Sequence, residues 1–190
     1  MRILNVARCT SHKCQSDLLK ACAILRANGV PVEATLVGDG PLRKDLEAQA
    51  GKLKLAESVT FLGAIPQDRM KSLYSNYDLL AIASESEGLP VALLEAMASR
   101  LPVIAPDAPY VTELAPNAAE MIGTFRLHDP DSLAALVSQI AASPDTAARR
   151  ERIAWEWVQG LTWDDVATKE WEEMAVAARS LRPTSSQPSD

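Results

Sequence analysis

Short apolar runs alternate with helical patterns along most of the chain, and this alternation constrains the fold more than any other feature. The apolar runs are continuous, as in strands that helices cover on both faces. Strands are predicted over residues 3–7, 32–37, 59–62, 79–83 and 102–105. Helices are predicted over residues 17–28, 42–53, 67–76, 90–99 and 110–115. This order predicts an α/β fold with a doubly wound parallel sheet and right-handed crossovers.

The pattern becomes helical after about residue 129. Helices are predicted up to residue 142, from 144 to about 157, and from 162 onward. Asp129 or Asp131 is interpreted as the cap of the first of these helices, not as a metal ligand. Residues 183–190 are rich in Pro and Ser, which predicts a disordered tail and leaves one domain over residues 1–182.

The composition excludes several classes of protein. Of the 190 residues, 47% are hydrophobic and 23% charged, which excludes global disorder. The net charge of -6 argues against a general nucleic-acid binder, and no apolar run is long enough to cross a membrane. Cys9, Cys14 and Cys22 are an odd set with no secretory signal before them, which predicts reduced thiols and a cytoplasmic protein. A zinc site that includes His12 is disfavoured, because the spacing fits no standard finger.

The most informative stretch for function is 84–98, which follows a predicted strand and leads into a helix. Glu95 is the only charged residue of that otherwise apolar helix, where a carboxylate is costly unless it is hydrogen-bonded or faces a cleft. Glu87 lies in the preceding loop, at the strand end where open α/β sheets bind ligands. The backbone N–H groups of Gly88 and Leu89 suit an anionic or hydroxyl-rich ligand. These residues favour a polyol or nucleotide site, with a solvated loop glutamate and a core-edge glutamate as alternatives.

This stretch resembles the Glu-x7-Glu signature of retaining glycosyltransferases of the GT-B fold, family 4 (group 1). The resemblance covers nearly the whole chain, as the carboxyl-terminal, donor-binding half, and implies a Rossmann-like domain with additional C-terminal helices. The matching residues, in chain order, are Arg8, Lys13, Gly38-Asp39-Gly40-Pro41, Phe61-Leu62-Gly63, Tyr74, Asp78, Leu94-Glu95-Ala96-Met97-Ala98, Pro102-Val103-Ile104-Ala105 and Trp163.

The resemblance implies roles for these residues. Glu95 would hold the ribose hydroxyls of a nucleotide-diphosphate sugar, and Glu87 would hold hydroxyls of the donor sugar. Arg8 and Lys13 would neutralise the leaving diphosphate and, with Glu87, form the catalytic group. The remaining substrate contacts are Gly88, Leu89, Pro90 and Val91 at the sugar, and Gly63 and Ile65 at the base. The family uses neither a protein nucleophile nor a metal, and its usual setting is polysaccharide biosynthesis with glycan or lipid-linked acceptors.

The sequence departs from the family pattern at three positions. Cys14 stands where a glycine usually follows the lysine, and a positive φ is less comfortable for cysteine. Ala7 replaces a common glycine, and Pro109-Tyr110 stands where many members have Gly-Gly. A non-catalytic nucleotide-sugar-binding or scaffold module of the same fold is therefore an alternative. A nucleotide-sugar epimerase of the same architecture is a third.

The family's active site lies between two halves, and the acceptor-binding, amino-terminal half does not appear in this sequence. The predicted first strand begins beside Met1. We therefore expect the missing half to come from a longer chain or from a separate protein. By itself, the chain is expected to bind a nucleotide diphosphate weakly and to transfer nothing.

Overall fold

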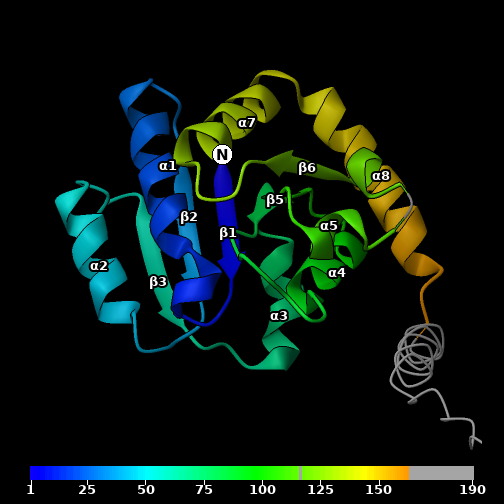
Figure 1. The fold of residues 1–190 in the computed structure, drawn as a ribbon, viewed down its shortest axis with the longest axis horizontal. Helices are drawn as coiled ribbons and strands as arrows, with labels where there is room; N and C mark the ends of the chain where they lie inside the picture. The colour runs from blue at the N-terminus through cyan, green and yellow to red at the C-terminus, as the bar shows by residue number, and fades with distance from the viewer. Residues whose placement is uncertain (116, 163–190) are drawn as a thin grey trace, which may run out of the picture. The chain divides into compact units, whose positions relative to one another are not determined.

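The computed structural model describes residues 1–115 and 117–162, of which Met1–Val158 form one compact unit. This unit is built on a sheet of six parallel strands in the order β3-β2-β1-β4-β5-β6 (Figure 1). That order is the Rossmann arrangement of a doubly wound sheet, so the predicted fold class is confirmed. The strands are β1 (Arg2–Val6), β2 (Glu33–Val37), β3 (Val59–Gly63), β4 (Leu79–Ala81), β5 (Val103–Pro106) and β6 (Ile122–Phe125).

Helices follow the strands along the chain, as predicted. A single 3-10 turn, η1 (Ser11–Lys13), precedes the first of them. The α-helices are α1 (Gln15–Ala27), α2 (Arg43–Lys52), α3 (Gln67–Tyr74), α4 (Val91–Ala98), α5 (Pro109–Thr112), α6 (Ala118–Met121), α7 (Pro130–Ala142) and α8 (Pro144–Gln159). No helix of the described residues has the length and apolar character needed to span a bilayer.

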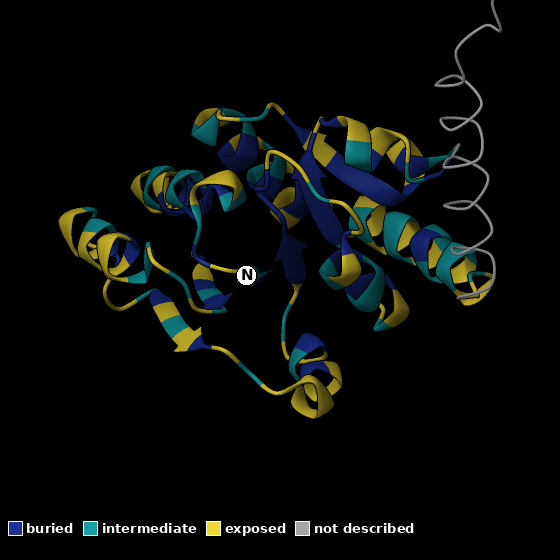
Figure 2. Cartoon of the chain, turned by 60° about the horizontal axis from the view of Figure 1, so that its bottom comes forward, coloured by how far each residue is buried: buried dark blue, intermediate teal, exposed yellow. Residues whose placement is uncertain are grey.

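The sheet separates two apolar clusters, one on each face. Ile3 of β1 belongs to the cluster that contains residues of α1, α2 and α7, and Leu4 belongs to the cluster that contains residues of α3, α4 and α8. Successive side chains of a strand point to opposite faces, so β1 must be apolar at both positions. Figure 2 shows the buried strands between the partly exposed helices. This two-sided burial is the physical reason for the continuous apolar runs in the sequence.

The strand β6 is not among the strands predicted from the sequence. Its four residues include Gly123 and Thr124, so the run is too short and too weakly apolar to stand out. It becomes a strand because it pairs in parallel with β5, from Val103 opposite Ile122 to Pro106 opposite Phe125. The last helix predicted from residue 162, Trp163 within it, and the boundary at 182/183 fall at or beyond the end of the described residues.

The helix α7 is capped by Asp129, whose Oδ1 accepts a hydrogen bond from the backbone N–H of Ser132 at 2.8 Å. This contact confirms the interpretation of the Asp-Pro-Asp triplet as a cap and assigns that role to Asp129 instead of Asp131. The hydrogen bond from Ser132 N–H, followed by the one from Arg126, holds the pKa of Asp129 below its usual value. The cap therefore contributes stability above the pKa of an unfolded aspartate, and this stability is lost as the pH falls through the lowered, folded pKa.

We expect Asp129→Ala to lower the thermal unfolding midpoint at neutral pH more than Asp131→Ala does, because Asp131 accepts no capping bond in the described structure. The difference between the parent protein and Asp129→Ala should shrink as the pH falls through the acidic range. Thermal melts followed by circular dichroism at several pH values measure both effects. Equal midpoints for the two variants at neutral pH would contradict the assignment of the cap.

Candidate functional site

The candidate site lies where the strand order reverses. The chain builds outward from β1 to β3 and then returns to place β4 on the other side of β1. The loops that follow β1 and β4 diverge at this point, and open α/β sheets bind ligands in the resulting crevice. The loop after β1 carries Arg8 and Lys13, and the loop after β4 carries Glu87. Glu95 lies further along, on α4.

Lys13 and Glu87 meet across this reversal. The Nζ atom of Lys13 lies 2.6 Å from Oε2 of Glu87, and each side chain is 16% exposed. The ion pair is short and charge-assisted. Because both side chains are mostly buried, solvent and salt screen this pair less than a surface pair. Two residues separated by 74 positions, both predicted to be catalytic, are thus in direct contact. Arg8 is exposed, and its side chain has no ion pair among the described residues.

The Gly38-Asp39-Gly40-Pro41 motif supports the loop that carries Arg8. The carbonyl of Asp39 accepts a hydrogen bond from Cys9 N–H at 3.0 Å, and Leu42 N–H donates to the carbonyl of Cys9 at 3.0 Å. Gly38 has a φ of +130°, and a Cβ atom built on it would lie 2.0 Å from the carbonyl oxygen of Ala7. The motif is therefore glycine-rich because two backbones approach each other closely, which no side chain permits.

Cys14 occupies a left-handed conformation with a φ of 50°. The structure thus confirms that the cysteine stands where the backbone favours glycine. It is the cap residue of α1, and its side chain makes no capping hydrogen bond to the first N–H groups of this helix. The buried Gln15 fixes the adjoining loop, because its Nε2 donates to the carbonyl of Arg8 at 2.8 Å.

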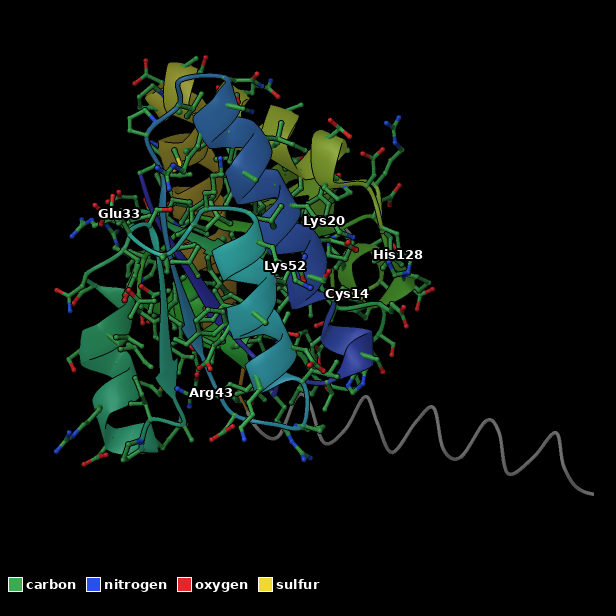
Figure 3. All side chains as sticks on the ribbon, turned by 90° about the vertical axis from the view of Figure 1, so that its left-hand side faces the viewer. Cys14, Lys20, Glu33, Arg43, Lys52 and His128 are labelled. Carbon is green, nitrogen blue, oxygen red and sulfur yellow. The ribbon has the colours of Figure 1, made fainter. Side chains whose placement is uncertain are left out.

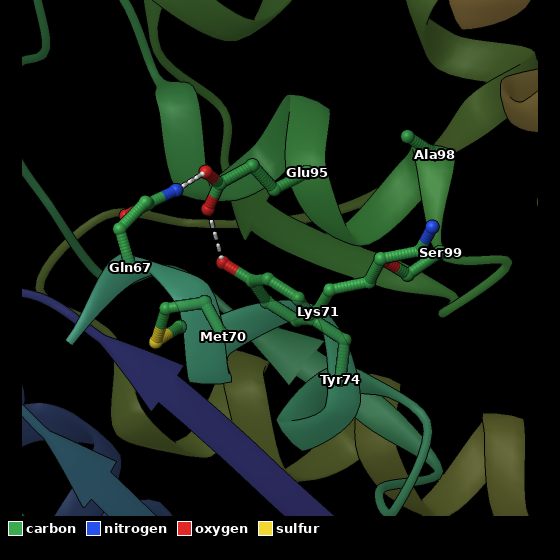
Figure 4. Close-up of a pocket in the computed structure, with 7 residues that line it drawn as sticks. All are labelled: Gln67, Met70, Lys71, Tyr74, Glu95, Ala98 and Ser99. Atoms are coloured by element: carbon green, nitrogen blue, oxygen red, sulfur yellow. Dashed lines mark hydrogen bonds between the residues drawn. The ribbon is translucent and has the colours of Figure 1, made fainter. Parts of the chain in front are cut away.

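The carboxylate of Glu95 accepts hydrogen bonds from two side chains of α3. Tyr74 OH donates to Oε2 at 2.8 Å, and Gln67 Nε2 donates to Oε1. Burial, and then the bond to Glu95, raises the pKa of Tyr74 far above its usual value, so its hydroxyl stays protonated as a donor. Figure 4 shows this arrangement in a pocket of about 320 Å³, lined by Gln67, Met70, Lys71, Tyr74, Glu95, Ala98 and Ser99.

The sequence predicts neither Tyr74 nor Gln67 as a site residue. Tyr74 stands out in it only as a match to the family, and Gln67 only as the start of a helix. A usable signal is present, because residues 67, 70, 71 and 74 follow the i, i+3, i+4, i+7 spacing of one helix face. That spacing shows which residues share a face, but the sequence does not show that this face meets Glu95.

The other predicted substrate contacts occupy the same edge of the sheet in different environments. Gly88, Leu89 and Val91 are exposed, and Pro90 is buried as the cap residue of α4. Gly63 has a φ of +72°, and its carbonyl accepts a hydrogen bond from Gly38 N–H at 2.8 Å. Ile65 is half-buried against the apolar cluster that contains α3 and α4.

Comparison with known proteins decides the family. The sequence profile of the family described as "Glycosyl transferases group 1" matches residues 2–157. The chain belongs to this family. The match covers all of the strands described above and every residue predicted for the site.

Two curated relatives and one solved structure illustrate the similarity to group 1 glycosyltransferases. The amylovoran biosynthesis glycosyltransferase AmsK of Erwinia amylovora is 30% identical over 179 residues, which cover 88% of this chain and 44% of AmsK. The alpha-monoglucosyldiacylglycerol synthase of Streptococcus pneumoniae is 32% identical over 143 residues, which cover 75% of this chain and 32% of the synthase. The crystal structure of HepE from Anabaena in complex with UDP and glucose has a TM-score of 0.78 at 23% identity and covers 92% of this chain and 48% of HepE. The chain thus spans less than half the length of each of these proteins.

This group 1 chain uses its Pro109-Tyr110 pair to hold the loop after β4. Pro109 opens the short helix α5, a position that its fixed φ favours. Tyr110 OH then donates a hydrogen bond to the carbonyl of Ser84 at 3.0 Å. Burial, and next the charge of Glu87, raises the pKa of Tyr110, so the hydroxyl remains a donor. The departure from the family pattern therefore anchors the loop that carries Glu87.

Proposed function

We propose that this chain is the donor-binding half of a retaining glycosyltransferase. The complete enzyme transfers a sugar from a nucleotide-diphosphate sugar to a glycan or lipid-linked acceptor. The observation that carries the proposal is the contact between Lys13 and Glu87 across the reversal of strand order. The names of AmsK and of the S. pneumoniae synthase, and the UDP and glucose bound to HepE, support this substrate class.

Donor binding exchanges the partners of the ion pair. The diphosphate binds Lys13 in place of Glu87. Arg8 is a second cation for it, and the amino end of α1 offers backbone N–H groups. Glu87 is then released to accept hydrogen bonds from the hydroxyls of the donor sugar. The exchange costs little free energy, because each charged group gives up one charged or polar partner and gains another.

Glu95 binds the ribose hydroxyls through carboxylate oxygens that Tyr74 and Gln67 already orient. Because Glu95 is already oriented, its side chain loses less conformational entropy when the nucleotide binds. The backbone of Gly88, Leu89, Pro90 and Val91 supports the sugar. Gly63 and Ile65, at the end of β3, flank the base.

Transfer proceeds without a metal cofactor in this proposal. The charge that develops on the departing diphosphate is stabilised by Arg8, by Lys13 and by the amino end of α1. The acceptor is held by an amino-terminal half, supplied in the same polypeptide or by a separate chain. We place the reaction in the cytoplasm, where the free thiols of Cys9, Cys14 and Cys22 stay reduced, and in polysaccharide biosynthesis.

The first test is isothermal titration of the chain with UDP, GDP, ADP and their sugar conjugates. We expect one nucleotide to bind, and Glu95→Ala and Arg8→Ala each to weaken its binding by about 10–100-fold, since each removes a hydrogen bond to a charged group. Glu120→Ala and Arg152→Ala are matched controls on exposed positions away from the crevice, and they should leave the affinity unchanged. Equal affinity in site and control variants would contradict the proposed site.

A non-catalytic nucleotide-sugar-binding module is the second candidate. It is favoured by the left-handed Cys14 and by the Lys13–Glu87 pair, in which two of the predicted catalytic side chains already hold each other. The chain joined to its amino-terminal half separates the two candidates. An enzyme loses sugar transfer in Glu87→Gln while it keeps nucleotide affinity, whereas a binding module shows no transfer before or after the change.

A further inference from the structure

Three side chains of different chemistry meet at the amino end of α1. They are Cys14, which caps the helix, Asp17 in its first turn, and His128 in the loop between β6 and α7. One potential ligand atom from each lies within 4.8 Å of the others. Figure 3 labels Cys14 and His128 at this position. Cys14 is buried, Asp17 is half-buried and His128 is exposed, so the cluster is open to solvent on one side.

His128 lies between two carboxylates. Its Nδ1 is 3.3 Å from Oδ2 of Asp17, and its Nε2 is 3.1 Å from Oε1 of Glu85. A neutral imidazole has one N–H, so it can donate to only one of these carboxylates. The lone pair of the other nitrogen would then face a carboxylate oxygen, which is repulsive. A metal ion bound to one ring nitrogen would remove this repulsion, because the other nitrogen then carries the N–H.

The position of Cys14 favours the metal ion. A metal ion bound to Nδ1 and to Asp17 gains Cys14 Sγ as a third ligand. Nε2–H is then free to donate to Glu85, and zinc-binding histidines characteristically donate their second N–H to a carboxylate in this way.

We propose that Cys14, Asp17 and His128 bind a zinc ion, with Glu85 orienting the histidine. Thiolate, imidazole and carboxylate are the ligands that zinc uses in proteins, while magnesium and calcium bind oxygen and exclude the thiolate. Three protein ligands leave a fourth tetrahedral position for water, on the solvent-exposed side of His128. Binding displaces the proton of the Cys14 thiol to solvent.

The backbone at two of the ligands is unusual, although Lys54 and Arg100 share this conformation away from the cluster. Cys14 and His128 both have left-handed conformations, with φ values of 50° and 56°. Such conformations are uncommon for residues other than glycine and cluster at functional sites. The ion would tie the loop after β6 to the residue that follows Lys13 and would fix the lysine-bearing turn. The ion would lie at the same helix end as the proposed diphosphate site, but the proposed sugar transfer does not require it.

Cobalt titration of the reduced chain tests the proposal directly. We expect one Co²⁺ to bind, with a thiolate-to-cobalt charge-transfer band and the visible bands of a tetrahedral ion, and one equivalent of Zn²⁺ to displace it. Cys14→Gly should remove the charge-transfer band. It should still fold, because glycine accepts the left-handed conformation without strain, which offsets part of the burial lost with the side chain.

His128→Gln and Glu85→Gln extend the test. Each is expected to weaken zinc binding by about tenfold or more, since one removes a ligand and the other its orienting carboxylate. His12→Gln changes the other histidine of the chain and should have no effect. Two results would overturn the proposal: no saturable binding of either metal by the parent chain, or a charge-transfer band that survives Cys14→Gly.

Discussion

Gly38→Ala is expected to lower the free energy of unfolding by at least about 4 kcal/mol, or to prevent folding altogether. A Cβ atom at this position would lie 2.0 Å from the carbonyl oxygen of Ala7. Both sides of the clash are backbone, so the two loops must move apart. This movement breaks the hydrogen bonds from Ala7 N–H to Val37 and from Gly38 N–H to Gly63, which are 2.9 and 2.8 Å long.

Urea unfolding measures this effect, and Gly51→Ala is its matched control. Gly51 lies in α2 and has no positive φ, and a Cβ atom added to it would have no neighbouring atom within 4 Å. Alanine there should raise the free energy of unfolding by roughly 0.5–1 kcal/mol, because glycine is unfavourable within a helix. A loss below about 1 kcal/mol in Gly38→Ala would show that the loops adapt and that the glycine motif has another cause.

Lys13→Glu is the second change with a large expected effect. It replaces the present ion pair by two neighbouring carboxylates at positions where each of the present side chains is only 16% exposed. We expect the free energy of unfolding to fall by about 3 kcal/mol, the low end for a broken buried pair. Nucleotide binding should be lost as well, because the new carboxylate repels the diphosphate.

The double variant Lys13→Glu/Glu87→Lys separates stability from binding. Restoring opposite charges should recover most of the lost stability in urea unfolding. It should not recover nucleotide affinity in titration, because the cation now lies on the loop after β4 instead of the loop after β1. Recovery of both properties would mean that the phosphate needs only a net positive charge, and that the placement of Lys13 has no specific role.

The sequence predicted the fold through its apolar runs. Ile3 and Leu4 are both apolar because α1 covers one face of β1 and α4 lies on the other. This requirement can be recognised in the sequence as consecutive apolar residues. The strand β6 was not predicted because its extended conformation depends on pairing with β5, which lies about 19 positions earlier in the chain.

The candidate site was predictable in part. Glu95 stood out as the only charge in an apolar helix and Glu87 as a residue at a strand end, whereas Lys13 was predicted only through the resemblance to the family. The donors to Glu95 did not stand out, because Tyr74 and Gln67 belong to another helix and contact it only after both helices pack on the sheet. The same is true of Tyr110, whose bond to Ser84 spans 26 positions.

The sequence by itself determined the elements that local chemistry controls: the strand runs, the helix ends, the glycine-rich loop and the family to which the motifs belong. The tertiary structure alone decided which of these elements meet. It joined Lys13 to Glu87 across 74 positions and brought His128 to Asp17 across 111. The physical reason is that burial and periodicity restrict the residue type at each position separately, so they leave a pattern along the sequence. A contact between two side chains depends on the folded path of everything between them.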